Sequence, residues 1–213
     1  MNHESYIVRE GLPFILISLT ITFIFAVLEF FWLTIFCSLV AIFVVAFFRN
    51  PQREIPRDEG SVVSPADGKI IKIDNVTESG LIKGDFRMIS IFMNVFNVHV
   101  NRIPCAGNIW TIDYKEGKFL RADLDKASIH NERNYLVMRT SRNEEIMFVQ
   151  IAGLIARRIV CWVKTGMAVK KGERFGLIRF GSRVDIYLPH GIDIQVELGQ
   201  KVRAGETVLG VRK

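Results

Sequence analysis

The hydrophobic and polar positions divide the chain into an apolar amino-terminal stretch and a longer, mixed remainder. Residues 12–48 are apolar almost throughout, and Glu29 is the only charged residue among them. This run exceeds the ~20 residues that one helix needs to cross the hydrocarbon core of a bilayer. It is too long for a signal peptide, and no small-residue cleavage site follows it. Residues 1–49 are therefore predicted to form a membrane anchor.

The position of Glu29 bears on the number of membrane passes. An unpaired charge near the middle of the bilayer costs several kcal/mol. A helical hairpin of two shortened passes, each of ~17 residues, would place Glu29 at the far interface beside the aromatic residues 30–32. No Gly or Pro marks a turn there, so a single pass stays an alternative. We favour a transmembrane helical hairpin.

The polar residues 50–60 include two prolines and are predicted to be a linker. Arg49, Arg53 and Arg57 follow the apolar run directly. By the positive-inside rule, these charges place both ends of the hairpin and the carboxy-terminal domain on the cytoplasmic side of the cell (inner) membrane.

From residue 61 onward the pattern is typical of β structure. Short runs rich in Ile, Val and aromatic residues are separated by Gly, Asp, Asn or Pro, which predicts a β-rich domain over residues 61–213. The runs are 70–73, 88–93, 98–103, 109–114, 135–139, 146–151, 184–188 and 192–196. The polar stretch 117–134 is expected to be a long loop or a short helix, and the periodicity of 155–163 fits either a strand or a helical turn.

An internal repeat refines the fold prediction. Residues 166–173 and 199–206 share the pattern Gly-x-x-Val-x-x-Gly-Glu, which reads as a tight turn, an apolar anchor and a second turn that leads into a strand. Similar pieces occur in barrel-sandwich hybrid folds such as biotin and lipoyl carrier domains. We therefore expect a mainly β, barrel-sandwich-hybrid-like domain behind the amino-terminal hairpin.

The net charge of +6 and the isoelectric point near 9.4 suggest an anionic partner. No block of Lys and Arg interleaved with aromatic residues is present, which argues against nucleic acid. Acidic lipid headgroups are the simpler partner for an anchored chain, although a mildly basic balance also serves solubility. Cys37, Cys105 and Cys161 are scattered and odd in number, which indicates a reducing compartment without a disulfide framework or a metal site.

Three side chains carry candidate chemistry. Ser182 follows Gly181, and a glycine before a scissile bond removes side-chain hindrance to attack by the serine hydroxyl. Asp67 precedes Gly68 in a predicted turn, and His99 alternates with valines in a predicted strand. Together they are the groups of a nucleophile, an orienting carboxylate and a general base. Taken singly, they also fit a turn serine, an Asp-Gly turn and a hydrogen-bonded sheet histidine.

Three motifs together resemble the phosphatidylserine decarboxylase proenzymes in their shorter prokaryotic form. They are Ser-Pro-Ala-Asp-Gly at 64–68, Phe-Met-Asn-Val-Phe-Asn-Val-His-Val-Asn-Arg at 92–102 and Phe-Gly-Ser at 180–182. The resemblance runs from about residue 48 to the end of the sequence. Longer bacterial enzymes usually have Leu-Gly-Ser-Thr at the cleavage point, where this chain has Phe180 and Arg183 around Gly-Ser. They also tend to have a second histidine where this chain has Arg102, which leaves open the step that His99 serves.

The resemblance implies a decarboxylase that makes its own cofactor by autocatalytic serinolysis. Ser182 would attack the carbonyl of Gly181, with His99 taking the hydroxyl proton and Asp67 orienting the imidazole. The chain would separate into a β fragment, 1–181, and an α fragment, 182–213. A pyruvoyl group formed from Ser182 would then bind phosphatidylserine as a Schiff base and release carbon dioxide and phosphatidylethanolamine. The expected partners are this lipid, the anionic membrane surface and the two fragments as a heterodimer, with a higher oligomer left open.

Two other classes of protein remain as alternatives. The repeat and the anchor also fit a membrane-anchored carrier or adaptor without catalysis, although the Met-Lys-Met of biotinylation is absent. A zinc peptidase of a related β fold would need paired histidine ligands, and no His-x-His occurs. Four arginines are candidates for the substrate phosphate or carboxylate, but solvated surface positions are the preferred interpretation: Arg102, Arg157, Arg158 and Arg183.

Overall fold

The computed structural model describes residues 5–78, 80–117, 131–153, 158–179 and 181–212. The chain divides into two compact units, Met1–Gln52 and Arg53–Lys213. The boundary falls within the stretch 50–60 for which the sequence predicts a linker.

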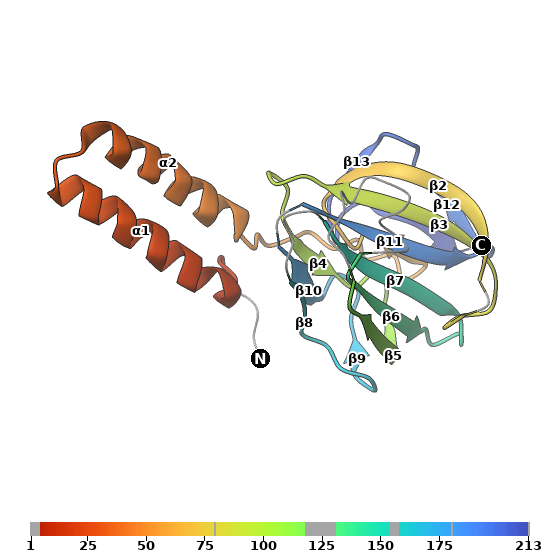
Figure 1. Ribbon diagram of the computed structural model, residues 1–213. Coiled ribbons are helices and arrows are strands. Elements are labelled where there is room, and N and C mark those ends of the chain that lie inside the picture. The colour runs from red at the N-terminus through yellow and green to blue at the C-terminus, as the bar shows by residue number, and fades with distance from the viewer. Residues whose placement is uncertain (1–4, 79, 118–130, 154–157, 180, 213) are drawn as a thin grey trace. The chain divides into compact units, whose positions relative to one another are not determined.

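The amino-terminal unit consists of a short 3-10 helix, Arg9–Gly11, followed by α1 (Leu12–Val27) and α2 (Phe31–Phe47), which lie side by side (Figure 1). Glu29 makes the tight connection in place of a glycine, with a left-handed φ of 59°. At the other end, backbone hydrogen bonds join residues 6–8 to 48–50. The helices therefore form a closed hairpin.

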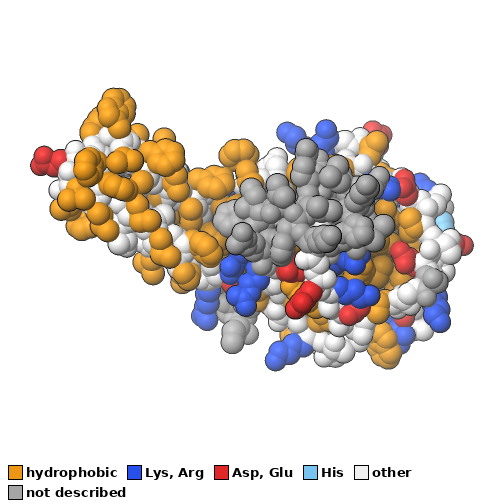
Figure 2. Space-filling model, in the orientation of Figure 1, with side chains coloured by type: hydrophobic (Ala, Val, Ile, Leu, Met, Phe, Trp, Pro, Cys, Tyr) orange, Lys and Arg blue, Asp and Glu red, His pale blue; other side chains and the backbone are white. Residues whose placement is uncertain are grey.

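Apolar side chains cover most of the outer surface of this hairpin (Figure 2). Trp32 is 78% exposed and Phe23 is 68% exposed. The exposure of such large apolar side chains is unfavourable in water and ordinary in contact with lipid. By length and composition, the helical segment Arg9–Val27 suffices to cross a membrane, whereas the other apolar helix, Phe31–Phe47, is shorter. The unit thus has the character of a membrane-associated segment, and the two-pass topology stays a prediction.

The second unit is built from antiparallel strands. An eight-stranded sheet has the order β13-β2-β3-β11-β7-β6-β5-β9, and two three-stranded sheets have the orders β1-β14-β12 and β4-β10-β8 (Figure 1). The strands are β1 (Ser61–Val63), β2 (Gly68–Glu78), β3 (Gly84–Met93), β4 (Val100–Arg102), β5 (Gly107–Lys115), β6 (Arg133–Arg139), β7 (Glu145–Ala152), β8 (Ile159–Cys161), β9 (Ala168–Val169), β10 (Arg174–Ile178), β11 (Ser182–Pro189), β12 (Ile192–Ile194), β13 (Lys201–Val202) and β14 (Val208–Arg212). Each of the eight predicted runs overlaps a strand, and β8 lies in the undecided stretch 155–163. The expected loop or helix over 117–134 falls mostly outside the described residues, and its end is corrected, because β6 already begins at Arg133.

The sequence repeat corresponds to a structural repeat. Gly166 and Gly199 both have left-handed φ values, 86° and 87°, and their amides donate to equivalent carbonyls of β5 and β2. Gly172 and Gly205 have φ values of 78° and 79°, and a Cβ on Gly205 would lie 3.7 Å from the Cα of Gly172. Each copy contributes one edge strand of the large sheet and one central strand of a small sheet. The prediction of a mainly β, hybrid-like domain is confirmed.

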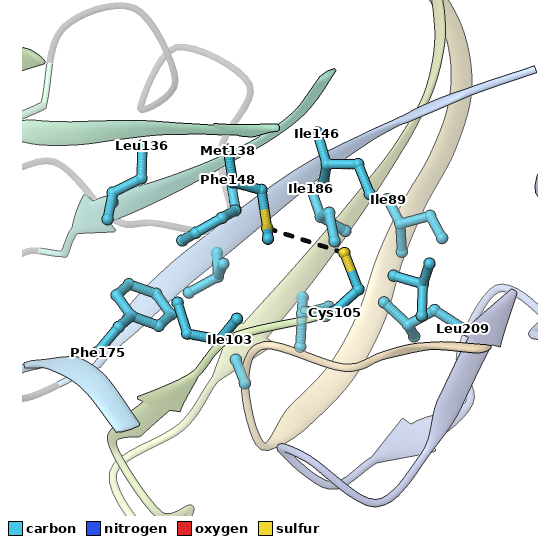
Figure 3. Packing of buried hydrophobic residues seen from close by; sticks show 14 of the residues in the cluster. Ile89, Ile103, Cys105, Leu136, Met138, Ile146, Phe148, Phe175, Ile186 and Leu209 are labelled. Carbon is cyan, nitrogen blue, oxygen red and sulfur yellow. Dashed lines mark hydrogen bonds between the residues drawn. The ribbon is translucent and has the colours of Figure 1, made fainter. Parts of the chain in front are cut away.

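The main hydrophobic core lies between the sheets (Figure 3). The rings of Phe148 and Phe175 meet edge to face with centroids 4.9 Å apart, and the buried Cys105 lies with its Sγ 3.8 Å from Sδ of Met138. Burial raises the pKa of the Cys105 thiol to about 11, and all three cysteines are free. A second cluster packs on the other face of the large sheet around Tyr187. Strand β11, in the middle of the sheet, is therefore buried on both faces.

Candidate active site

Ser182 is the first residue of β11 and is fully buried. It pairs with Met93 at the end of β3 and with Ala152 at the end of β7. Among the described residues its Oγ has no hydrogen-bond partner. A buried hydroxyl without a partner is uncommon in native proteins, because it loses its bonds to water without replacing them. This hydroxyl is therefore a candidate for chemistry rather than for structural support.

Gly181 precedes Ser182 with a left-handed φ of 64°. A residue with a side chain pays roughly 1–2 kcal/mol for this conformation. Apart from its two chain neighbours, no described residue has an atom within 4 Å of a Cβ built at this position. The left-handed backbone conformation is therefore a reason for glycine here, and the expectation that glycine also relieves hindrance to attack by Ser182 stays a prediction. Phe180, the remaining residue of the motif, lies outside the described residues.

His99 lies in the segment just before β4 rather than in a strand, which corrects the sequence-based placement. Its side chain is buried, and Nδ1 lies 3.0 Å from the carbonyl oxygen of Asn97. A carbonyl only accepts, so Nδ1 carries the proton of this bond. At the other side of the ring, the backbone N–H of Gly181 donates to Nε2 at 3.3 Å. Both bonds specify the same neutral tautomer, with the lone pair on Nε2 directed at the Gly181–Ser182 region.

Asp67 lies in the predicted turn before β2, where its carboxylate is bound by residues far away in sequence. One guanidinium nitrogen of Arg53 donates to both carboxylate oxygens at 3.0 and 2.8 Å, and the backbone N–H of Ala204 donates at 2.7 Å. The N–H of Arg102 donates to the carbonyl of Pro65, which brings this turn beside the segment that carries His99. Nδ1 of His99 donates to the carbonyl of Asn97, so the orienting role of Asp67 stays a prediction.

Arg102 and Arg183 are buried, so the preferred interpretation of solvated surface arginines is wrong for both. Arg102 donates to the carbonyl of Gly172 at 2.8 Å. Burial lowers its pKa to about 10, and the positive charges of Arg174 and Arg53 act in the same direction. Arg158 is exposed, as expected of a surface arginine, and Arg157 lies outside the described residues.

A phosphatidylserine decarboxylase family model matches residues 40–210, which is most of the chain. The chain belongs to the phosphatidylserine decarboxylase family. It is 52% identical over 212 residues to the phosphatidylserine decarboxylase proenzyme of Syntrophus aciditrophicus, covering 99% of both chains. It is 49% identical to that of Geotalea uraniireducens, covering 99% of this chain and 98% of the relative. The proenzyme of Magnetococcus marinus is 44% identical, with 99% and 97% covered.

Membership in the phosphatidylserine decarboxylase family makes the chain an enzyme of the carboxy-lyase class and sets aside the carrier and zinc peptidase alternatives. Within the described residues, no group of three or more His, Cys, Asp or Glu side chains is arranged to hold a metal ion.

Sequence reasoning missed a series of buried amides near the decarboxylase candidate site. Asn134 donates to Gln150 and Gln150 donates to Asn101, both at 2.9 Å, and the Asn101 amide lies 3.7 Å from Sδ of Met93, the cross-strand neighbour of Ser182. The available signal was Gln150 itself, a polar residue at an inward position of the apolar run 146–151. An amide series buried beside the site gives it fixed polar groups without adding charge.

The Arg53–Asp67 pair should support the stability of the β domain. Replacing Asp67 by Asn should lower the free energy of unfolding by about 3 kcal/mol, because the buried Arg53 keeps its charge with only Glu206, at 3.5 Å, as an ionic partner. For a chain of this size the melting temperature, measured in detergent, should fall by roughly 6–12 °C. The control is Asp74→Asn in the exposed Lys72–Asp74 pair, with an effect of about 0.5 kcal/mol or less. An Asp67→Asn variant with the same melting temperature as the wild type would contradict the expectation.

Proposed function

We propose that this chain decarboxylates phosphatidylserine to phosphatidylethanolamine with a pyruvoyl group that it generates from its own Ser182. The observation that carries the proposal is the buried hydroxyl of Ser182, which has no hydrogen-bond partner among the described residues. It directly follows Gly181, whose N–H donates to Nε2 of His99. The relatives support it, since each is described as a proenzyme.

Self-cleavage begins with transfer of the Ser182 hydroxyl proton to His99 as Oγ attacks the carbonyl carbon of Gly181. The peptide C–N bond breaks, leaving an ester on Oγ and a free amine at residue 182. Loss of the Cα proton of residue 182 expels the Gly181 carboxylate and leaves a dehydroalanine. Water then replaces its nitrogen, which leaves as ammonia, and a ketone remains at the start of the α fragment.

The imidazole is prepared for the first of these proton transfers. Its neutral tautomer is fixed at both nitrogens, with the carbonyl of Asn97 as the acceptor at Nδ1 and the N–H of Gly181 as the donor to Nε2. Nε2 would exchange this donor for the Ser182 hydroxyl as the proton is transferred. We further propose that Asp67 stabilises the imidazolium formed in this step, through its negative charge and through the turn that it holds beside residues 99–102.

The residues around Ser182 fit a pyruvoyl group. The position is buried, has no side-chain hydrogen bond to lose, and lies in backbone pairing with β3 and β7. A ketone there supplies an electron sink for the carbanion left when carbon dioxide departs. Within this site His99 would deliver the proton to the substrate carbon that carbon dioxide has left, and the surrounding strands would exclude water.

The two fragments would remain associated as a heterodimer. The α fragment, 182–213, contributes β11 to β14, and the β fragment, 1–181, contributes the strands β3, β7, β2 and β1 that pair with them. We also propose that the helical hairpin anchors the enzyme in the cell (inner) membrane, with the β domain on the cytoplasmic side and the basic chain attracted to anionic lipid. A higher oligomer stays open.

Intact-mass analysis of the expressed wild-type chain tests the self-cleavage directly. We expect two fragments that together account for residues 1–213, less the ammonia lost at residue 182 and plus the water added. The smaller fragment should resist amino-terminal sequencing, because its first residue has a ketone in place of an amine. A fully active preparation that contains only the continuous chain would refute the proposal.

A further inference from the structure

The strand that begins at Ser182 carries a buried ion pair immediately after it. Nε of Arg183 donates to Oδ1 of Asp185 at 2.6 Å, and a terminal guanidinium nitrogen donates to Oδ2 at 2.7 Å. The two side chains are only 3% and 1% exposed. Their neighbours on β7 are the apolar Ile151 and Val149. A buried ion pair in such surroundings is often no more stabilising than apolar residues of similar size, so stability alone does not account for it.

The position of this pair matters because of what the proposed cleavage does to β11. Before cleavage, residue 182 is held by the chain on both sides. Afterwards it is a chain end, and chain ends fray unless they are tied down. Only the pairing with Met93 and Ala152 would then restrain it. Yet a reacting group must stay within about 0.5 Å of its productive position.

We infer that the Arg183–Asp185 pair holds the new amino-terminal end of the α fragment in its sheet; this inference rests on the proposed self-cleavage. Both partners belong to the α fragment, so the cut cannot separate them. For residues 182 and 183 to peel away from β3 and β7, the guanidinium must leave Asp185, whose carboxylate would then be buried without its cation. Breaking a buried pair in this way is strongly disfavoured, by about 100-fold or more in population.

The pair acts through the backbone and not on the substrate. Successive side chains of a strand point to opposite faces, so Arg183 and Asp185 lie on the face of β11 opposite to Ser182. They are therefore positioning residues. Their loss should lower kcat and leave KM nearly unchanged.

The test compares the wild type with the double variant Arg183→Met/Asp185→Leu, which keeps the volume and leaves no buried charge. The control is Arg139→Met/Glu145→Leu, which removes another arginine–carboxylate pair, between β6 and β7, in which two guanidinium nitrogens donate to one oxygen of Glu145. In the cleaved double variant we expect the amides of residues 184 and 185 to exchange hydrogen about tenfold faster than in the wild type, because exposing an apolar side chain at position 183 costs less than breaking a buried ion pair. Its kcat should fall at least tenfold with KM within about twofold, and the control should match the wild type in both respects.

The inference would be overturned if the cleaved double variant had the hydrogen-exchange rates and the kcat of the wild type. It would also be overturned by a folded double variant that stays uncut, because the pair would then act before cleavage. A second measurement leaves the ion pair intact. The hydrogen exchange of the same two amides is compared between the cleaved wild type and the uncut Ser182→Ala protein.

We expect the protection of these amides against exchange to differ by no more than about tenfold between the two proteins. A loss of protection of more than 100-fold on cleavage overturns the inference. An uncut wild-type chain refutes the proposed function itself, whereas a cleaved wild type with an unaffected variant refutes only the role of the pair.

Discussion

Replacing Ser182 by alanine should leave the chain in one piece and reduce decarboxylation to the uncatalysed background. Alanine fits the fully buried position without strain, because the oxygen that is removed has no hydrogen-bond partner in the part of the chain that the structure describes. The fold should therefore be kept, or slightly stabilised, since one unsatisfied buried polar group disappears. Intact-mass analysis, thermal unfolding and a carbon dioxide release assay on the same preparation measure the three outcomes.

The structure offers a matched control for this variant. Ser90 on the neighbouring strand β3 is also fully buried, and within the described ranges its Oγ has no hydrogen-bond partner. It pairs with Asp185, on the face of the sheet opposite to Ser182. Ser90→Ala should be cleaved and active like the wild type. Two fragments from the Ser182→Ala chain would show that another group performs the cleavage.

Replacing His99 by alanine should slow self-cleavage by about 10²–10⁴-fold, the usual contribution of a positioned general base. Conversion of freshly synthesised chain into fragments, followed over time by mass, measures this rate. The variant also loses the bonds that join the Gly181 amide and the Asn97 carbonyl to the ring, so part of the effect comes from misplacement of the scissile bond.

Two comparisons separate these contributions. His99→Gln retains hydrogen-bonding groups but has no basic nitrogen, and it should remain as slow as His99→Ala if proton transfer dominates. His190→Ala, in an exposed turn after β11, should be cleaved at the wild-type rate. Efficient cleavage of His99→Ala would remove the imidazole from the maturation step and leave it, at most, a role in decarboxylation.

The sequence was a good guide to the strands and a poorer guide to their ends and partners. The longer alternating runs were predicted because their periodicity follows burial on one face of a sheet. The two-residue strands β9 and β13 have too few positions to show any period, and their place follows from the left-handed glycines of the repeat. Periodicity also does not fix where a strand begins, and His99 was therefore placed in a strand that begins one residue later, at Val100.

The candidate site shows the same limit. Ser182, Gly181 and His99 were identified by residue type and by motifs that resemble those of the phosphatidylserine decarboxylases, and the structure brings Gly181 and His99 into direct contact. The partners of Asp67 could not have been found in this way, because Arg53 comes from the linker and Ala204 from the carboxy-terminal repeat. Burial of an arginine depends likewise on which surfaces meet in three dimensions, and no local pattern records that.

The pairing of β14 with β1 has a consequence for when the enzyme can mature. These strands lie near opposite ends of the β domain's sequence, and β13 likewise pairs with β2. Contacts over such separations form late and slowly, because a long loop must close first. If the chain cuts itself as proposed, the sheets around Ser182 are complete only after β14 has been synthesised, and a shorter nascent chain is not expected to cut itself.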